Sequence, residues 1–110
     1  MAYLTRDLVN VIAELRKRLE ELYGSRFHDL LLYGSYARGE ADEGSDVDLL
    51  VLLDGPVDTG LEIKRTSNIS APLSLAHDIL LALMPVDYEA YQKGKTSFLR
   101  IVRKDATRAA

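Results

Sequence analysis

Residues 31–53 read LLYGSYARGEADEGSDVDLLVLL, and in them two apolar segments frame a connection rich in glycine and acidic residues. The second segment, residues 47–53, is almost entirely aliphatic, which is too short for an average helix and typical of a strand buried on both faces. The first segment, residues 27–33, is predicted to be a strand that ends at Gly34. Because only about twelve residues join the two strands, an antiparallel pair of neighbours is the simplest arrangement.

Two carboxylates stand at the start of the second strand. Asp46 and Asp48 are two residues apart, so their side chains are expected on the same face of the strand. Like charges this close repel each other unless a divalent cation or another partner neutralises them. Mg²⁺ prefers one or two protein carboxylates together with phosphate oxygens and water. The spacing therefore indicates a metal site, and a pair of solvated acids at a strand end is the structural alternative.

A candidate phosphate-binding turn lies at the end of the first strand. Gly34 lets the backbone approach a phosphate closely, and the Ser35 hydroxyl can then hold that phosphate. In the antiparallel arrangement Ser35 lies beside Asp46 and Asp48. Arg38 follows three residues after Ser35, and it could reach the same phosphates or form a salt bridge within the loop.

The rest of the chain alternates helical and strand patterns. Thr5 can cap a helix from about residue 6 to Tyr23, in which apolar residues recur every three or four positions. Further expected elements are a helix over 59–75 that Pro72 and polar residues interrupt, a strand over 79–86, a short helix over 88–93, and a helix over 96–105 that buries Phe98, Leu99 and Val102. This order predicts an α/β fold: one domain over residues 1–110, with a small mixed sheet of three main strands flanked by helices.

A third acid is expected at the same edge of the sheet. A helical stretch separates the second strand from the third, which favours a parallel crossover and brings the two strand starts together. Asp78 stands at the predicted start of the third strand, with the same parity as Leu80 and Ala82. Three acids around one or two cations would form a site for phosphoryl or nucleotidyl transfer. Asp87 is the fallback, although it lies at the far end of that strand.

The length, cysteine content and net charge of the chain exclude several classes of protein. The chain has 110 residues, no cysteine and a net charge of -3, which is typical of a small intracellular globular domain and argues against disulfides, thiol catalysis and direct nucleic-acid binding. No apolar run is long enough for a membrane span, and a cytoplasmic location is expected. Residues 92–110 hold six basic residues and one acid, so a basic tail follows an acidic body.

These residues resemble a known family. Gly34-Ser35, ten intervening residues and Asp46-Val47-Asp48 form the signature of the DNA polymerase β-like nucleotidyltransferase superfamily. The neighbouring residues 36–39 and the small size resemble the minimal nucleotidyltransferase (MNT) family, and the resemblance covers nearly the whole chain. It implies the nucleotidyltransferase fold, two Mg²⁺ ions and ATP as the donor. By the same resemblance Gly34 and Ser35 hold the donor phosphates, Asp46 and Asp48 bind metal, and Asp78 matches the third metal-site carboxylate, which acts as general base.

The resemblance also implies a partner. MNT proteins accompany HEPN-domain ribonucleases in pairs that resemble toxin–antitoxin systems, in which the MNT protein adds AMP to a tyrosine of the toxin. The expected function is therefore an antitoxin that transfers AMP from ATP to a HEPN toxin. Two alternatives stay open: a nucleotidyltransferase acting on a small hydroxylated molecule such as an aminoglycoside, and a non-catalytic module that neutralises its partner by contact. Exposed apolar surface and the basic tail would serve the partner interface or a homo-oligomer.

Overall fold

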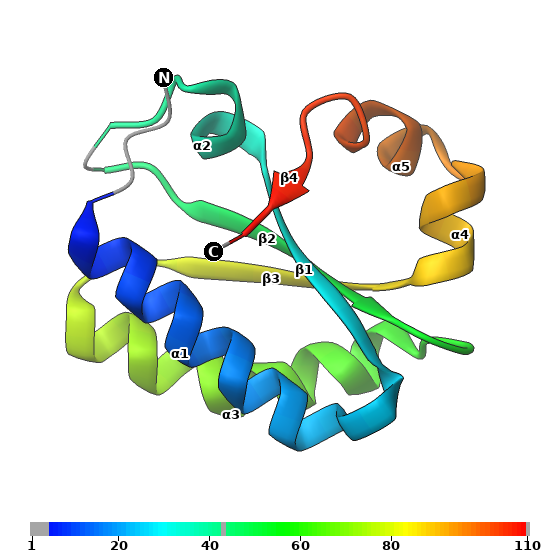
Figure 1. Cartoon of the computed structure of the whole chain (residues 1–110), viewed down its shortest axis with the longest axis horizontal. Coiled ribbons are helices and arrows are strands. Elements are labelled where there is room, and N and C mark those ends of the chain that lie inside the picture. The colour runs from blue at the N-terminus through cyan, green and yellow to red at the C-terminus, as the bar shows by residue number, and fades with distance from the viewer. Residues whose placement is uncertain (1–4, 43, 110) are drawn as a thin grey trace.

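The computed structural model describes residues 5–42 and 44–109, which form a mixed four-stranded sheet with helices on both faces (Figure 1). Two long helices, α1 and α3, lie together below the sheet in this view, and α4 and α5 lie above it. The helices are α1 (Arg6–Tyr23), a 3₁₀ turn at Gly24–Arg26, α2 (Gly34–Arg38), α3 (Thr59–His77), α4 (Tyr88–Lys93) and α5 (Ser97–Val102). The strands are β1 (Phe27–Tyr33), β2 (Val47–Leu53), β3 (Leu81–Asp87) and β4 (Thr107–Arg108).

The strand pairing confirms the topology predicted from the sequence. The spatial order is β3-β2-β1-β4, with β1 antiparallel to β2 and β2 parallel to β3. In this register Tyr33 lies opposite Asp48, and Asp48 lies beside Ala82. The end of β1 and the starts of β2 and β3 therefore meet at one end of the sheet.

Strand β2 is buried on both faces, as its aliphatic sequence predicts. Val47, Leu49, Val51 and Leu53 pack in the cluster that contains the apolar residues of α1. The alternate residues Leu50 and Leu52 pack against Leu99 and Val102 of α5. Burying each aliphatic side chain stabilises the fold by about 1.5–3 kcal/mol before entropy is counted. The strand that carries Asp48 is thus fixed from both sides.

Helix α1 has the predicted bounds and cap. The Thr5 side chain accepts a hydrogen bond from the backbone N–H of Leu8 at 3.1 Å, which satisfies one of the free donors at the helix start. Leu8, Val11, Ile12, Leu15 and Leu19 form its buried face. The expected helical period therefore places one apolar face of α1 on the sheet.

Helix α3 is longer than predicted and continues through Pro72 to His77. Its buried positions are Glu62, Thr66, Ser70 and Leu73, so three of the four are polar and the apolar period is missing from the sequence. Pro72 is exposed, and it has no backbone N–H to donate to the helix. Its neighbour Leu73 packs in the core and keeps the helix continuous at this point. The start of β3 consequently shifts from residue 79 to Leu81.

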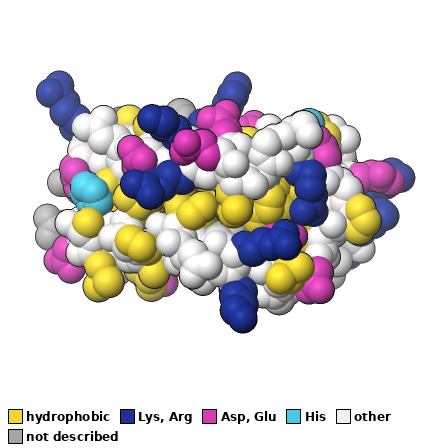
Figure 2. Space-filling model, turned by 90° about the horizontal axis from the view of Figure 1, so that it is seen from below, with side chains coloured by type: hydrophobic (Ala, Val, Ile, Leu, Met, Phe, Trp, Pro, Cys, Tyr) yellow, Lys and Arg dark blue, Asp and Glu magenta, His cyan; other side chains and the backbone are white. Residues whose placement is uncertain are grey.

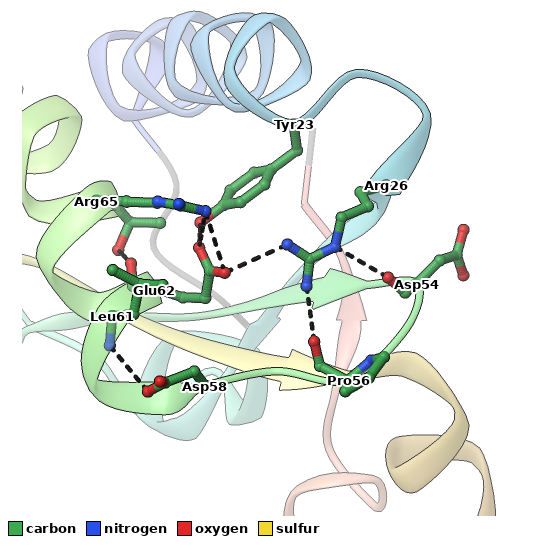
Figure 3. A network of polar contacts seen from close by, with 9 residues as sticks. Tyr23, Arg26, Asp54, Pro56, Asp58, Leu61, Glu62 and Arg65 are labelled. Carbon is green, nitrogen blue, oxygen red and sulfur yellow. Dashed lines mark hydrogen bonds and ion pairs between the residues drawn. The ribbon is translucent and has the colours of Figure 1, made fainter.

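A charged network joins the start of α3 to the start of β1 (Figure 3). The Tyr23 hydroxyl donates to Glu62 Oε1 at 2.7 Å, and Arg26 Nη1 donates to Glu62 Oε2 at 3.2 Å. Burial alone would raise the pKa of Glu62, but the hydrogen bonds from Tyr23 and Arg26 and the charge of Arg65 outweigh it and hold that pKa below its usual value. Glu62 is 2% exposed, so it is a buried, ionised carboxylate. Its contacts with Tyr23 and Arg26 anchor the start of α3.

The C-terminal part differs from the prediction in two ways. The last helix covers Ser97–Val102 and not 96–105, and Phe98 is 42% exposed instead of buried. The chain then forms the short strand β4, which the sequence did not predict. Arg16 holds this segment by donating to the backbone carbonyl of Ala109 at 2.9 Å, and β4 pairs with Leu31 and Leu32.

The face formed by α1 and α3 carries apolar side chains between charged ones (Figure 2). Figure 2 shows a hydrophobic band along this face with Lys and Arg beside it. The exposed apolar residues of the two helices are Val9, Leu22, Leu61, Ile63 and Leu75. Within the described residues, the model contains no helix with the length and hydropathy of a membrane span.

Candidate active site

The predicted phosphate turn lies where β1 passes directly into α2. Tyr33 is extended, Gly34 has φ 74°, and the helical turn ends after Arg38 at Gly39. A Cβ atom at Gly34 would lie 3.2 Å from Asp48 Cγ and would overlap its Oδ2. Both the backbone conformation and the close approach of Asp48 therefore require glycine at this position.

Ser35 is partly exposed beside this glycine. Its backbone carbonyl accepts hydrogen bonds from the N–H groups of Gly39 and Glu40, which closes the helical turn. Its hydroxyl makes no hydrogen bond to any residue that the structure describes. The hydroxyl is therefore available to a ligand at the end of β1.

Asp46 and Asp48 lie together at the start of β2, as predicted. Asp46 is exposed, and Asp48 is half-buried between Tyr33 of β1 and Ala82 of β3. Among residues 5–42 and 44–109, neither carboxylate has a hydrogen-bond donor or an ion-pair partner. Burial, followed by the charge of Asp46, raises the pKa of Asp48, and the more distant charge of Arg38 opposes that rise. Two unpaired carboxylates therefore repel each other at one end of the sheet.

Tyr33 forms the apolar wall next to Asp48. Its ring meets the ring of Phe98 edge-on, with centroids 5.9 Å apart. Burial raises the pKa of Tyr33, and the neighbouring charge of Asp48 adds to the rise, so its hydroxyl stays protonated. Tyr36, in contrast, is only 5% exposed and belongs to the core. Of the two tyrosines that flank the turn, Tyr33 is the one beside the acids.

Arg38 forms the loop salt bridges that were the structural alternative to phosphate binding. Its Nε donates to Glu40 Oε1 at 3.0 Å, and its Nη1 lies 3.7 Å from Asp105 Oδ2. The guanidinium nevertheless acts on Asp48, because its charge lowers the pKa of that carboxyl. Arg38 therefore neutralises part of the acidic site from its edge.

Asp78 does not lie on the third strand, and this placement corrects the prediction. It caps the end of α3 in the left-handed conformation, with φ 52°, and its backbone N–H donates to the carbonyl of Ser74. Because α3 continues to His77, the chain needs three more residues before β3 begins, and the side chain of Asp78 is exposed. The β3 residue beside Asp48 is Ala82.

The predicted convergence of three acids is likewise not seen. In the part of the chain that the structure describes, no group of three or more His, Asp or Glu side chains is placed to hold a metal ion. Asp78 does share one surface hollow with Asp46 at the end of α3, and Asp48 is not part of its lining. Asp46 is therefore the acid that the two places share: its charge acts on Asp48, and it lines the hollow that contains Asp78.

Two further candidates have structural partners. His77 lies 3.4 Å from Asp7, which ties the end of α3 to the start of α1. Asp87 lies at the far end of β3, where its side chain caps α4 by accepting from the N–H of Glu89 at 3.0 Å. The structure thus gives both residues local structural contacts, and Asp87, the fallback for the third acid, lies at the opposite end of the strand from Asp46 and Asp48.

The apolar surface beside the acids was not predicted from the sequence. Leu75 and Leu80 line the hollow that contains Asp46 and Asp78, and they are 85% and 56% exposed. Leu80 was predicted to be an inward-facing strand residue, because the apolar run around it suggested an earlier start of β3. The exposure of Leu80 could have been predicted if α3 had been extended to His77. The polar buried face of α3 hid that extension, because it lacks the apolar period of a helix.

The geometry suits a divalent cation whose remaining coordination positions are filled by a bound ligand. Within residues 5–42 and 44–109, the carboxylate oxygens of Asp46 and Asp48 have no hydrogen-bond donor, and the absence of a side chain at Gly34 lets the Asp48 carboxylate lie against the turn. Mg²⁺ commonly takes one or two carboxylates and fills its remaining positions with phosphate oxygens and water. Burial and then the charge of Asp46 raise the pKa of Asp48, and a cation here would offset both effects.

The sequence matches the nucleotidyltransferase domain family over residues 12–107. A protein of Methanocaldococcus jannaschii that is provisionally named a protein adenylyltransferase is 34% identical over 93 residues, which cover 84% of this chain and 89% of that protein. The protein adenylyltransferase MntA of Thermococcus cleftensis is 44% identical over 52 residues, which cover 46% of this chain and 50% of that protein.

A solved structure supports the same architecture. A chain from a structure described as a toxin–antitoxin crystal structure with AMP-PNP superposes with a TM-score of 0.62, covering 93% of this chain and 72% of that chain. The two sequences are 22% identical, so this similarity establishes the fold alone.

Proposed function

The chain belongs to the nucleotidyltransferase domain family, and we propose that it is a Mg²⁺-dependent adenylyltransferase that moves AMP from ATP to a hydroxyl of a partner protein. The observation that carries the proposal is the pair of unpartnered carboxylates, Asp46 and Asp48, beside the glycine turn at Gly34. The names of two relatives, both protein adenylyltransferases, support AMP as the transferred group and a protein as the acceptor.

Gly34 and Ser35 would hold the donor phosphates. The missing Cβ of Gly34 lets the Asp48 carboxylate lie directly against the turn, and the Ser35 hydroxyl has no other partner among the described residues. ATP would then lie with its phosphates between the end of β1 and the start of β2. Arg38 would contribute long-range positive charge to this position.

Asp46 and Asp48 would hold the metal, which we expect to be two Mg²⁺ ions. The bound metal would supply charge neutralisation to the triphosphate and polarise the attacking hydroxyl. The two carboxylates would fix its position, since β2 is buried on both faces and cannot shift. Their mutual repulsion favours metal binding, because the cation removes a destabilising interaction of the empty fold.

The reaction needs a group that accepts a proton from the acceptor hydroxyl. In the transfer, the hydroxyl oxygen bonds to the α-phosphorus of ATP, the bond to the β-phosphate bridge breaks, and pyrophosphate leaves with that electron pair. Asp78 is our candidate base, because its exposed carboxylate shares a hollow with Asp46. A phenol is a poor nucleophile until it loses its proton, and general-base catalysis contributes about 10²–10⁴-fold to rates of this kind.

The acceptor that we propose is a tyrosine of a HEPN-domain ribonuclease, with this chain as its antitoxin. The resemblance to MNT proteins supports this choice, and so does the toxin–antitoxin description of the structural neighbour. The test uses a HEPN-domain ribonuclease as the candidate partner, Mg²⁺, and ATP labelled at either the α- or the γ-phosphate. Adenylyl transfer puts only the α label on the partner. Transfer of the γ label would contradict the proposal.

A further inference from the structure

A second surface begins at Asp46 and leads away from the phosphate turn. It is a hollow between the loop that precedes β2, the last turn of α3 and the chain that enters β3. Its lining includes Ser45, Asp46, Leu75, Asp78 and Leu80, and we call it the Leu75–Leu80 hollow. Gly34 and Ser35 are not among its lining residues, so the hollow is distinct from the phosphate turn and meets the proposed metal site at Asp46.

Two leucines of this hollow are strongly exposed. Leu75 is 85% exposed and Leu80 is 56% exposed, although both stand next to elements that bury other leucines completely. Figure 2 shows hydrophobic side chains at the left end of the α1/α3 face, the end at which α3 finishes in Figure 1. Helix α3 thus places polar residues inward and Leu75 outward. Clustered apolar exposure beside polar groups is typical of an interaction site.

We propose that the Leu75–Leu80 hollow is the docking surface for the protein acceptor, and that its two leucines bind an apolar side chain next to the hydroxyl-bearing residue. This inference rests on the proposed adenylyl transfer and adds the position and chemistry of acceptor recognition. The hydroxyl would lie between Asp46 and Asp78. Its oxygen bonds to the α-phosphorus, pyrophosphate leaves, and the proton passes to the Asp78 carboxylate.

The composition of the hollow favours a protein over a small polar acceptor. A hydroxylated sugar would gain little from two exposed leucine side chains, whereas a polypeptide can bury them with an apolar neighbour of its acceptor residue. The position of the hollow also favours acceptor binding, because Asp46 belongs both to the proposed metal pair and to the lining of this hollow. A segment bound there is adjacent to the reacting phosphate.

The experiment compares Leu75→Ser and Leu80→Ser with Ile101→Ser as the matched control. Ile101 is 62% exposed on α5 and does not line the hollow. The probe is a HEPN-domain ribonuclease, the proposed partner, and the readouts are AMP transfer at limiting partner and partner affinity without ATP. We expect each leucine substitution to lower kcat/KM for the partner about tenfold and to weaken binding by a similar factor, with the KM for ATP unchanged. Ile101→Ser should stay within about twofold of the parent chain.

Several results would overturn the inference. One is that both leucine variants keep parent-like transfer and affinity. Another is that the chain is a dimer that either variant dissociates while transfer persists, because the hollow would then bind a second copy. Transfer to kanamycin at equal rates in all variants, with none to the partner, would also overturn it. If the parent transfers no AMP, the proposed function fails, and the affinity measurement alone decides whether the hollow docks the partner.

Discussion

Gly34 and Asp48 share one small volume at the end of the sheet. A Cβ at Gly34 would lie 3.2 Å from Asp48 Cγ and 3.3 Å from Asp48 Cβ, and it would overlap the carboxylate oxygen. The phosphate turn and the metal-site carboxylate are therefore coupled directly, because moving one displaces the other. This coupling gives a physical reason for a glycine in front of Ser35.

Gly34→Ala should disable the site with a limited loss of stability. The positive φ costs about 1–2 kcal/mol for a residue with a Cβ. The displaced Asp48 carboxylate should lower kcat/KM about a hundredfold, since a misplacement of about 1 Å can have that effect. The matched control is Gly55→Ala, because Gly55 has φ 89° and its Cβ would meet nothing within 4 Å. Equal activity losses in the two variants would show that strain alone, and not the contact with Asp48, is responsible.

Asp46→Asn and Asp48→Asn should each lower AMP transfer about a thousandfold or more, because several kcal/mol of metal stabilisation disappear from the transition state. Addition of Mg²⁺ with ATP should raise the melting temperature of the parent chain and have a smaller effect on either variant. Differential scanning fluorimetry checks the second effect, and removal of Mg²⁺ with EDTA should abolish it. Full activity of both variants would exclude these carboxylates as metal ligands.

Asp48 should reduce the stability of the empty fold at neutral pH. Burial and the charge of Asp46 raise its pKa, so the folded chain holds this proton more tightly than the unfolded chain does. Stability is therefore lost as the pH rises above the ordinary carboxyl pKa of about 4. We expect Asp48→Asn to melt at a higher temperature than the parent at pH 7 in EDTA, and the difference to vanish near pH 3. A less stable variant at pH 7 would contradict this account.

Glu62→Gln should lower the free energy of unfolding by about 2 kcal/mol at pH 7, because Arg26 and Arg65 lose their buried carboxylate. The pKa of Glu62 is held below its usual value, so its contribution is present above the unfolded pKa of about 4.3 and is lost as the pH falls through the folded value. Urea titrations from pH 7 to pH 3 should show the gap to the parent closing. Glu14→Gln, which removes an exposed pair with Arg18, should cost less than about 0.5 kcal/mol at any pH.

Substitutions at Asp78 can test its proposed role as a base without destabilising the fold. Asparagine and glycine both tolerate the left-handed conformation at φ 52°, so Asp78→Asn and Asp78→Gly should fold normally. If Asp78 accepts the acceptor proton, both variants should lose about 10²–10⁴-fold in kcat and lose the acidic limb of the pH–rate profile. Unchanged profiles would assign the base to another group.

The sequence predicted most of this fold because its signals were local. The aliphatic run of β2, the Thr5 cap and the glycine-to-acid spacing each act within a few residues, and the structure places each as expected. Helix α3 was the exception. Its buried Glu62 is stabilised by Tyr23 and Arg26 from distant parts of the chain, a compensation that no pattern within 59–77 encodes.

The errors at the site follow from that one helix. Its extension to His77 moved Asp78 off β3 and left Leu80 in solvent. The strand β4 was missed for a similar reason, since its two residues depend on Arg16, which is far away in the sequence. The sequence predicted that the turn after β1 lies beside Asp48, but the contact between the Gly34 backbone and the Asp48 carboxylate needed the three-dimensional structure.

The most direct test of the central claim is the intact mass of a HEPN-domain ribonuclease, the proposed partner, after incubation with this chain, ATP and Mg²⁺. We predict a gain of one or more AMP units on the partner, which is absent with Asp46→Asn and absent when EDTA removes the metal. An unchanged partner mass, while a stable complex with this chain still forms, would contradict the claim that these carboxylates serve adenylyl transfer.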